Sequence, residues 1–88
     1  HFAEDTIEFE NPLFMEEEIG ALVSLEGVTA QRINENENII LYTLHAPKTI
    51  ADLLTFSKKV EKPIKNIYLR KPSLEDLYFK LTGKENWK

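Results

Sequence analysis

The 88-residue chain contains no cysteine and only three glycines, and these shortages exclude several kinds of site. Without cysteine the chain has neither a disulfide framework nor a thiolate-bound metal. A phosphate-wrapping loop of the Walker type needs two glycines that bracket four residues, followed by Lys and Ser or Thr, and the glycines at positions 20, 27 and 83 do not have this spacing. No apolar run approaches the roughly 20 residues that span a bilayer. We therefore expect a soluble chain without a nucleotide loop of its own.

Charge and histidine content exclude further functions. Fifteen acidic residues against eleven basic ones give a net charge of −4, which is the wrong sign for a protein that neutralises phosphates, so nucleic acid is not an expected partner. Nucleophilic catalysis needs a base beside the nucleophile, and His45 is the only histidine apart from His1. The acidic run 16–18 occupies consecutive helix positions about 100° apart, so its carboxylates cannot converge on one ion. We expect no metal, no cofactor and no catalytic activity.

Apolar periodicity predicts four strands and two helices in the order β, α, β, β, α, β. The strands are expected at residues 6–10, 28–33, 39–44 and 64–70. The first helix is predicted to be capped by Asn11, to begin at Pro12 and to end at Gly27. The second is predicted between its cap Thr49 and Pro63. With right-handed crossovers this order gives a ferredoxin-like α+β sandwich, in which two helices cover one face of a four-stranded antiparallel sheet.

The second face of this sheet is expected to be open to solvent. The polar residues placed on it by the first and fourth strands are Thr6, Glu8, Glu10, Asn66, Tyr68 and Arg70. Because these two strands should be neighbours, we predict a cross-strand pair between Glu8 and Arg70. At an exposed site such a pair is worth only roughly a few tenths of a kcal/mol.

The segment 71–85 predicts a further helix with a clear start and stop. Ser73 follows Pro72 and is expected to cap the helix, with Asp76 three residues later completing a near capping box. Gly83 supplies a left-handed stop. The helix carries an apolar stripe that must pack on some surface, and it comprises Leu74, Leu77, Tyr78 and Leu81.

Residues 70–83 also resemble a known segment. Their order, Arg-Lys-Pro-Ser-Leu-Glu-Asp, three apolar residues, one variable residue and Leu-Thr-Gly, is similar to the closing segment of the accessory domain that follows the ATP-binding domain in many bacterial ABC-type exporter ATPases. The run Leu25-Glu26-Gly27-Val28 resembles the Leu-Pro-Gly-Val helix exit of such domains. The motif residues, which are also the candidate interface, are Pro72, Ser73, Leu74, Glu75, Asp76, Tyr78, Phe79, Leu81 and Gly83.

This resemblance implies one accessory domain over residues 1–88, with 84–88 as a tail, belonging to a longer ATPase chain. Such a domain is non-catalytic and supports ATPase assembly or coupling to the membrane permease in export, while ATP and Mg belong to the preceding domain. The expected partners are the ATPase core of the same polypeptide, a second copy of the subunit and the permease, without direct insertion into the membrane. The expected location is the cytoplasm, at the inner face of the cell membrane.

On the last helix, Leu74, Tyr78 and Phe79 are candidates for two roles. A helix with Tyr78 and Phe79 beside its leucine stripe has a wider apolar face than one docking surface requires. These side chains are therefore expected either to contact a partner or to cover the core of the domain itself. Trp87 in the tail is expected to be half-buried rather than functional.

Three other functions share this order of elements and stay open. An ACT-like domain that senses small molecules usually has a glycine-bearing turn after its first strand, where this chain has Asn11 and Pro12. An acylphosphatase-like enzyme needs an arginine and backbone amides around a phosphate, where this chain has Glu10 and Glu16. An RNA-binding sheet needs outward aromatic residues with basic neighbours, whereas Glu8 and Glu10 are placed on that surface.

Overall fold

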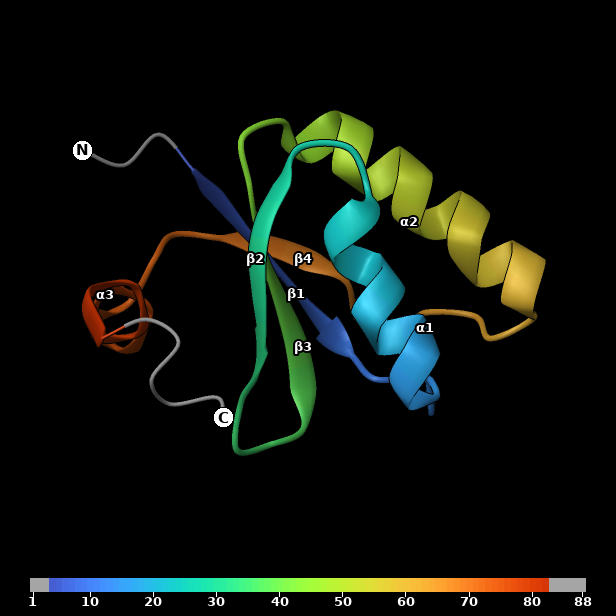
Figure 1. Cartoon of the computed structure of the whole chain (residues 1–88), viewed down its shortest axis with the longest axis horizontal. Helices are drawn as coiled ribbons and strands as arrows, with labels where there is room; N and C mark the ends of the chain where they lie inside the picture. The colour runs from blue at the N-terminus through green and yellow to red at the C-terminus, as the bar shows by residue number, and fades with distance from the viewer. Residues whose placement is uncertain (1–3, 83–88) are drawn as a thin grey trace.

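A four-stranded antiparallel sheet with the strand order β2-β3-β1-β4 forms the centre of the computed structural model, which describes residues 4–82 (Figure 1). Along the chain the elements are β1 (Asp5–Glu10), α1 (Glu16–Ala21), a 3₁₀ turn (Leu22–Ser24), β2 (Val28–Ile33), β3 (Asn38–Thr43), α2 (Ala46–Val60), β4 (Tyr68–Arg70) and α3 (Leu74–Thr82). This arrangement confirms the predicted α+β sandwich of ferredoxin-like type with an added C-terminal helix.

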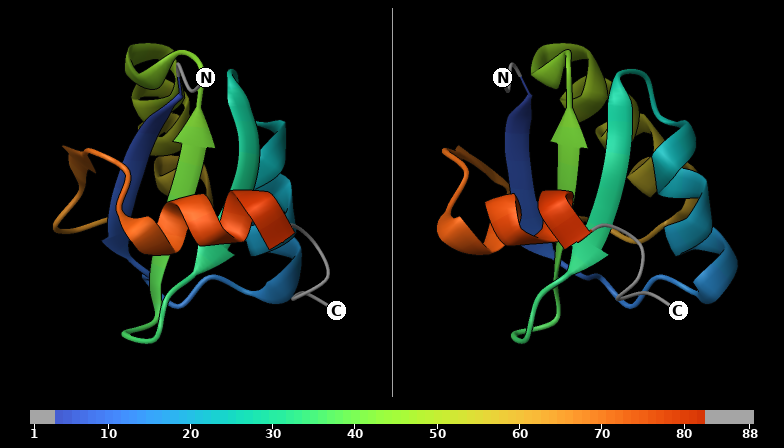
Figure 2. Two further views of the ribbon diagram at one scale, coloured as in Figure 1. Left: turned by 90° about the vertical axis from the view of Figure 1, so that its left-hand side faces the viewer. Right: turned by 60° about the vertical axis from the view of Figure 1, so that its left-hand side comes forward.

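The hydrophobic core lies between the sheet and the layer formed by α1 and α2. β1 and β3 are the inner strands and are almost wholly buried, and the near-continuous apolar run of β3 is typical of a central strand. The buried core residues are Ile7, Phe9, Phe14, Leu22, Ile39, Leu41, Ala46 and Leu53. α3 lies on the opposite face of the sheet and runs across the strands (Figure 2).

The first helix begins later than the sequence predicts. Asn11 does not cap a helix that starts at Pro12; its side-chain oxygen instead accepts a hydrogen bond from the backbone N–H of Phe14 at 2.9 Å. Leu13 within this turn has a φ of 70°, in the left-handed region, so the chain cannot be helical there. α1 therefore begins only at Glu16. Its acidic first turn still lies at the positive end of the helix dipole, as expected.

The second helix begins earlier than predicted, at Ala46 rather than after Thr49. Pro47 lies in the first turn, where its missing N–H costs nothing. Thr49 is buried inside the helix, and its hydroxyl donates to the backbone carbonyl of Glu26 at 2.5 Å. The predicted cap thus serves as a link between α2 and the turn before β2.

The fourth strand is shorter than predicted. It covers Tyr68–Arg70 instead of 64–70, because Asn66 has a φ of 55° and interrupts the extended chain. Ile64 and Ile67 nevertheless pack against the core. β4 is therefore a brief edge strand whose attachment depends on side chains as well as on its ladder with β1.

Candidate docking surface on the C-terminal helix

α3 begins with the capping box that the sequence predicts. The backbone N–H of Ser73 donates to Asp76 Oδ2 at 2.7 Å, and the N–H of Asp76 donates to Ser73 Oγ at 3.4 Å. These two bonds satisfy donors that a helix start otherwise leaves unpaired. The predicted stop at Gly83, the tail 84–88 and Trp87 lie outside the described residues.

The helix lies on the sheet with its polar side inward. Asp76 is completely buried and Phe79 partly so, whereas the side chains of the predicted apolar stripe are exposed. The exposed fractions are 82% for Leu74, 38% for Leu77, 65% for Tyr78 and 81% for Leu81. We call these four residues the outer stripe. Because successive helix residues are rotated by about 100°, a helix that buries positions 76 and 79 must direct positions 74, 78 and 81 away from the sheet.

A buried cluster of charged and phenolic groups holds this orientation. The cluster, named here the Asp76 cluster, consists of Arg32 from β2, Tyr42 from β3, Arg70 from β4 and Asp76 itself. Arg70 binds the carboxylate in bidentate fashion, with Nη1 2.6 Å from Oδ2 and Nη2 3.2 Å from Oδ1. Arg32 Nη2 donates to Oδ1 at 2.8 Å, and the Tyr42 hydroxyl donates to the same oxygen at 2.5 Å. One carboxylate on α3 is thereby joined to three strands of the sheet.

The predicted pair between Glu8 and Arg70 is present, but in a different setting from the one expected. Arg70 Nε lies 2.8 Å from Glu8 Oε1, and the exposed fraction of Glu8 is only 7%. The other carboxylate oxygen of Glu8 accepts hydrogen bonds from the side-chain amides of Asn34 and Asn38. The expectation of an open sheet face is therefore wrong at Thr6 and Glu8, because this part of the face is buried on the side where α3 lies.

These contacts set the protonation states of the cluster. Burial alone would raise the pKa of Asp76, but hydrogen bonds from Arg70, Tyr42 and Arg32 outweigh it and hold that pKa far below its usual range. Burial, together with the bond to Asp76, raises the pKa of Tyr42 to about 12. Burial would also raise the pKa of Glu8, but bonds from Asn38 and Arg70 lower it. At neutral pH Asp76 and Glu8 are ionised and balance the two arginines, and Tyr42 remains a hydrogen-bond donor.

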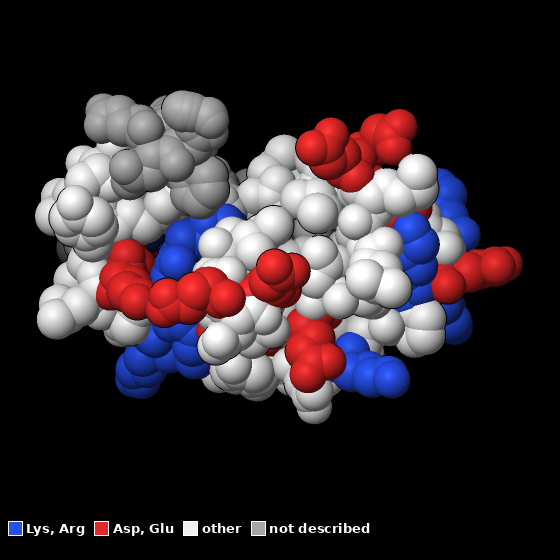
Figure 3. Space-filling model, turned by 90° about the horizontal axis from the view of Figure 1, so that it is seen from below, with Lys and Arg blue, Asp and Glu red and all other residues white. Residues whose placement is uncertain are grey.

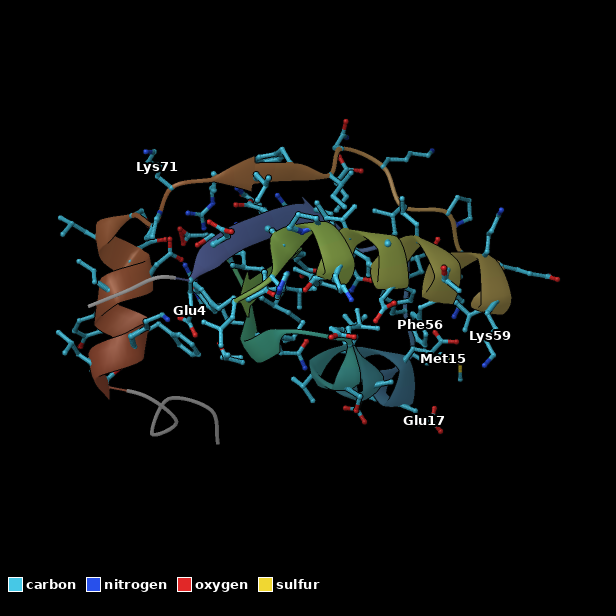
Figure 4. All side chains as sticks on the ribbon, turned by 90° about the horizontal axis from the view of Figure 1, so that it is seen from above. Glu4, Met15, Glu17, Phe56, Lys59 and Lys71 are labelled. Atoms are coloured by element: carbon cyan, nitrogen blue, oxygen red, sulfur yellow. The ribbon has the colours of Figure 1, made fainter. Side chains whose placement is uncertain are left out.

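Aromatic and cationic side chains complete the inner side of α3. The ring of Phe79 stacks on that of Tyr42, with centroids 5.6 Å apart and planes 14° from parallel. Lys80 Nζ lies 4.9 Å from the centroid of the Tyr42 ring and forms an ion pair with Glu4. Glu4 lies beside α3 in Figure 4. Of the three residues with two expected roles, Phe79 therefore packs within the domain, while Leu74 and Tyr78 face solvent.

The hollow beside this helix is too small for a metabolite. It measures about 30 Å³, the space of roughly one water molecule. Its lining residues are Glu4, Thr6, Tyr42, Pro72, Asp76, Leu77 and Lys80. Within residues 4–82, no group of three or more His, Asp or Glu could hold a metal ion, and no helix is long and apolar enough to cross a membrane.

The sequence did not identify Arg32 and Tyr42 as partners of Asp76. Both residues lie in predicted strands, and no role was predicted for either side chain. One signal was available: Arg32 and Tyr42 fall on the same sheet face as Glu8, because Arg32 is opposite Ile40 and Ile40 is opposite Glu8 in the strand registers. A buried arginine on that face requires an acidic partner, and the carboxylate of α3 provides it.

Comparison of the chain with models of known protein families, with curated proteins and with solved structures gives no match. Acidic and basic side chains are interspersed on the face seen in Figure 3, without a broad area of one sign. The outer stripe is an apolar feature of α3, in which Leu74, Tyr78 and Leu81 are turned away from the sheet and Leu77 lies beside the small hollow.

Proposed function

We propose that this chain is a non-catalytic accessory domain of an ABC transporter ATP-binding subunit, and that the outer stripe contacts the ATP-binding domain of the same polypeptide. The observation that carries the proposal is the orientation of α3. The Asp76 cluster fixes the helix in an orientation that exposes Leu74, Tyr78 and Leu81 to solvent, where they can contact another surface. The resemblance of residues 70–83 to the accessory domains of exporter ATPases supports the same assignment.

The size of the outer stripe favours a partner that is tethered. A large apolar side chain presents on the order of 150–200 Å² when fully exposed, so at the observed exposures the stripe offers roughly 500 Å². Free proteins that form stable complexes usually bury about 800 Å² each. Contacts between domains of one chain are smaller, and a linker supplies an effective concentration in the millimolar range. An adjoining domain of the same polypeptide is therefore the occupant that fits this area.

In this proposal the domain itself catalyses no reaction. ATP and Mg are bound by the ATP-binding domain, and the accessory domain supports assembly of the ATPase and its coupling to the permease during export. A second copy of the subunit and the permease are further partners of the complex. The domain works in the cytoplasm, at the inner face of the cell membrane, without entering the bilayer.

Site-specific photo-crosslinking in the native polypeptide tests the proposal. A photoreactive phenylalanine analogue replaces Tyr78 in one variant and Leu54 in another. Leu54 is the matched control, because it is an apolar residue with 45% exposure on α2, in the opposite layer. We expect the analogue at position 78 to crosslink to a peptide of the ATP-binding domain and the analogue at position 54 to give only background.

Two results would contradict the proposal. Equal crosslinking from both positions would show that exposure alone, and not a specific contact, determines the yield. Crosslinks from position 78 exclusively to another subunit would assign the outer stripe to a different partner.

A further inference from the structure

Asp76 is bound in the way that proteins bind a free carboxylate ligand. Its two oxygens receive charge-assisted bonds from Arg70 and Arg32 and a short bond from Tyr42, and the acid is completely buried. We propose that Arg32, Tyr42 and Arg70 form a carboxylate receptor on the sheet, in which Asp76 is a replaceable ligand that fastens α3. This proposal does not depend on the transporter assignment.

The receptor groups are positioned by contacts that do not involve Asp76. Arg32 Nε donates to the hydroxyl oxygen of Tyr42 at 2.9 Å, which orients that guanidinium along the sheet. Arg70 Nε donates to Glu8 Oε1 at 2.8 Å, and Asn38 Nδ2 donates to the other oxygen of that carboxylate, Oε2, at 2.8 Å. The groups that remain directed at the site are Arg32 Nη2, both Nη atoms of Arg70 and the Tyr42 hydroxyl. All four donors are therefore in place before a carboxylate arrives.

The charges of the site also favour an anion. Two guanidinium groups and one carboxylate, that of Glu8, belong to the sheet, so the receptor carries one excess positive charge without Asp76. Glu75 also approaches Arg32, at 3.8 Å, but 68% of its side chain is exposed, so solvent screens its charge. A second buried carboxylate is needed to neutralise the site, and Asp76 supplies it.

The rest of α3 contributes little apolar contact that could hold the helix without this ligand. Leu74 and Leu81 face solvent, Leu77 lies at the edge of the helix beside the small hollow, and the ring of Phe79 stacks on Tyr42 of the sheet. The attachment of α3 is thus mainly an ion-binding event. In that case a free carboxylate of the same size should be able to occupy the receptor when the side chain of Asp76 is removed.

Chemical rescue of Asp76→Gly by acetate tests this inference, because acetate matches the Cβ and carboxylate atoms that the substitution deletes. Thermal unfolding of the full chain is measured at pH 7 in sodium chloride and in sodium acetate at equal ionic strength. At 0.1 M acetate we expect the variant to melt about 8 °C higher than in chloride, the shift that a ligand with a Kd near about 10 mM produces in a domain of this size. In the same titration the Nε–H resonances of Arg32 and Arg70 should shift in a saturable way.

Three matched proteins serve as controls. The unaltered chain and Asp76→Asn have a side chain in the receptor, so acetate should raise their melting temperatures no more than chloride does. Glu75→Ala loses a neighbouring acid that lies outside the receptor, and it should also show no acetate-specific shift.

The proposal is overturned if Asp76→Gly melts at the same temperature in both salts. It is also overturned if the variant remains unfolded in acetate, since Asp76 would then not be replaceable by a free carboxylate. An equal acetate effect in all four proteins would likewise contradict it. None of these outcomes bears on crosslinking at position 78, so this inference and the proposed function can fail separately.

Discussion

Replacing Asp76 by Asn removes one buried charge and almost nothing else, so it measures how much the Asp76 cluster stabilises the protein. The amide has the size of the carboxylate, but it cannot accept charge-assisted bonds from both arginines and from Tyr42. Breaking a buried ion pair from one side typically costs 3–5 kcal/mol. Because Arg32 and Arg70 keep 11% and 22% of their side-chain area exposed, we expect a loss near the lower end, about 3 kcal/mol.

The expected loss is a large share of the total free energy of unfolding. A chain of 88 residues is expected to have a free energy of unfolding of roughly 4–13 kcal/mol. Urea unfolding followed by far-ultraviolet circular dichroism at pH 7 gives the difference between variant and unaltered chain. The matched control is Glu75→Gln on the same helix turn, where the acid is exposed, and it should change the free energy of unfolding by less than about 0.5 kcal/mol.

The difference should also depend on pH with a definite sign. The pKa of Asp76 is lowered in the folded protein, so its contribution is fully present above the unfolded pKa of about 3.9 and is lost as the pH falls further. The stabilities of the unaltered chain and of Asp76→Asn should therefore differ at pH 7, and the difference should shrink steadily as the pH falls from about 4 to about 2. A loss below about 1 kcal/mol at pH 7, or a difference that does not shrink over this range, would refute the reasoning.

Four further substitutions test the structure. Tyr78→Ala removes a ring that is 65% exposed and should change the free energy of unfolding by less than about 0.5 kcal/mol, whereas Phe79→Ala should lower the melting temperature clearly, as scanning calorimetry of the pair will show. Gly27→Ala places a Cβ 2.7 Å from a buried hydroxyl at a φ of 85°, so urea unfolding should show a loss of more than about 1 kcal/mol; an unchanged midpoint would contradict the observed turn. Tyr42→Phe removes the 2.5 Å bond to the α3 carboxylate and should cost about 1–3 kcal/mol. Because the folded pKa of Tyr42 is raised to about 12, the advantage of the unaltered chain over Tyr42→Phe should hold below pH 10 and disappear as the pH rises towards 12; an advantage that does not change with pH would argue against a buried donor.

The sequence predicted the architecture because strand alternation depends on neighbouring residues. Ile7 and Phe9 on one side and Glu8 on the other are enough to identify β1 and its two faces. The order of elements then places β1 beside β4, which is why the pair between Glu8 and Arg70 could be predicted. Its energetic weight could not be predicted, because that depends on the burial that accompanies α3.

Helix boundaries failed where a side chain competes with the backbone. Asn11 and Pro12 have the letters of a helix start, yet the Asn11 side chain closes a turn onto Phe14 and postpones the helix. The left-handed φ of Leu13 could not be inferred from its residue type, and that of Asn66 was signalled only weakly, because asparagine adopts this region more often than other non-glycine residues but not regularly. The start of α1 and the length of β4 therefore could not be predicted.

The direction in which α3 faces could not be decided from the sequence. Its apolar stripe was expected either to contact a partner or to cover the core, and in the structure the buried side carries Asp76. The partners that decide this are Arg32, which is 44 residues away in the sequence, and Arg70. Contacts over such separations are set by the tertiary fold, so the local pattern predicted the helix but left its rotation open.

The orientation of α3 separates the stability of the domain from the apolar surface that it presents. Since Leu74 and Leu81 take almost no part in holding the domain together, a change at either position alters that surface while leaving the folding intact. Selection, or an engineer, could therefore modify this surface one residue at a time without a compensating mutation in the interior.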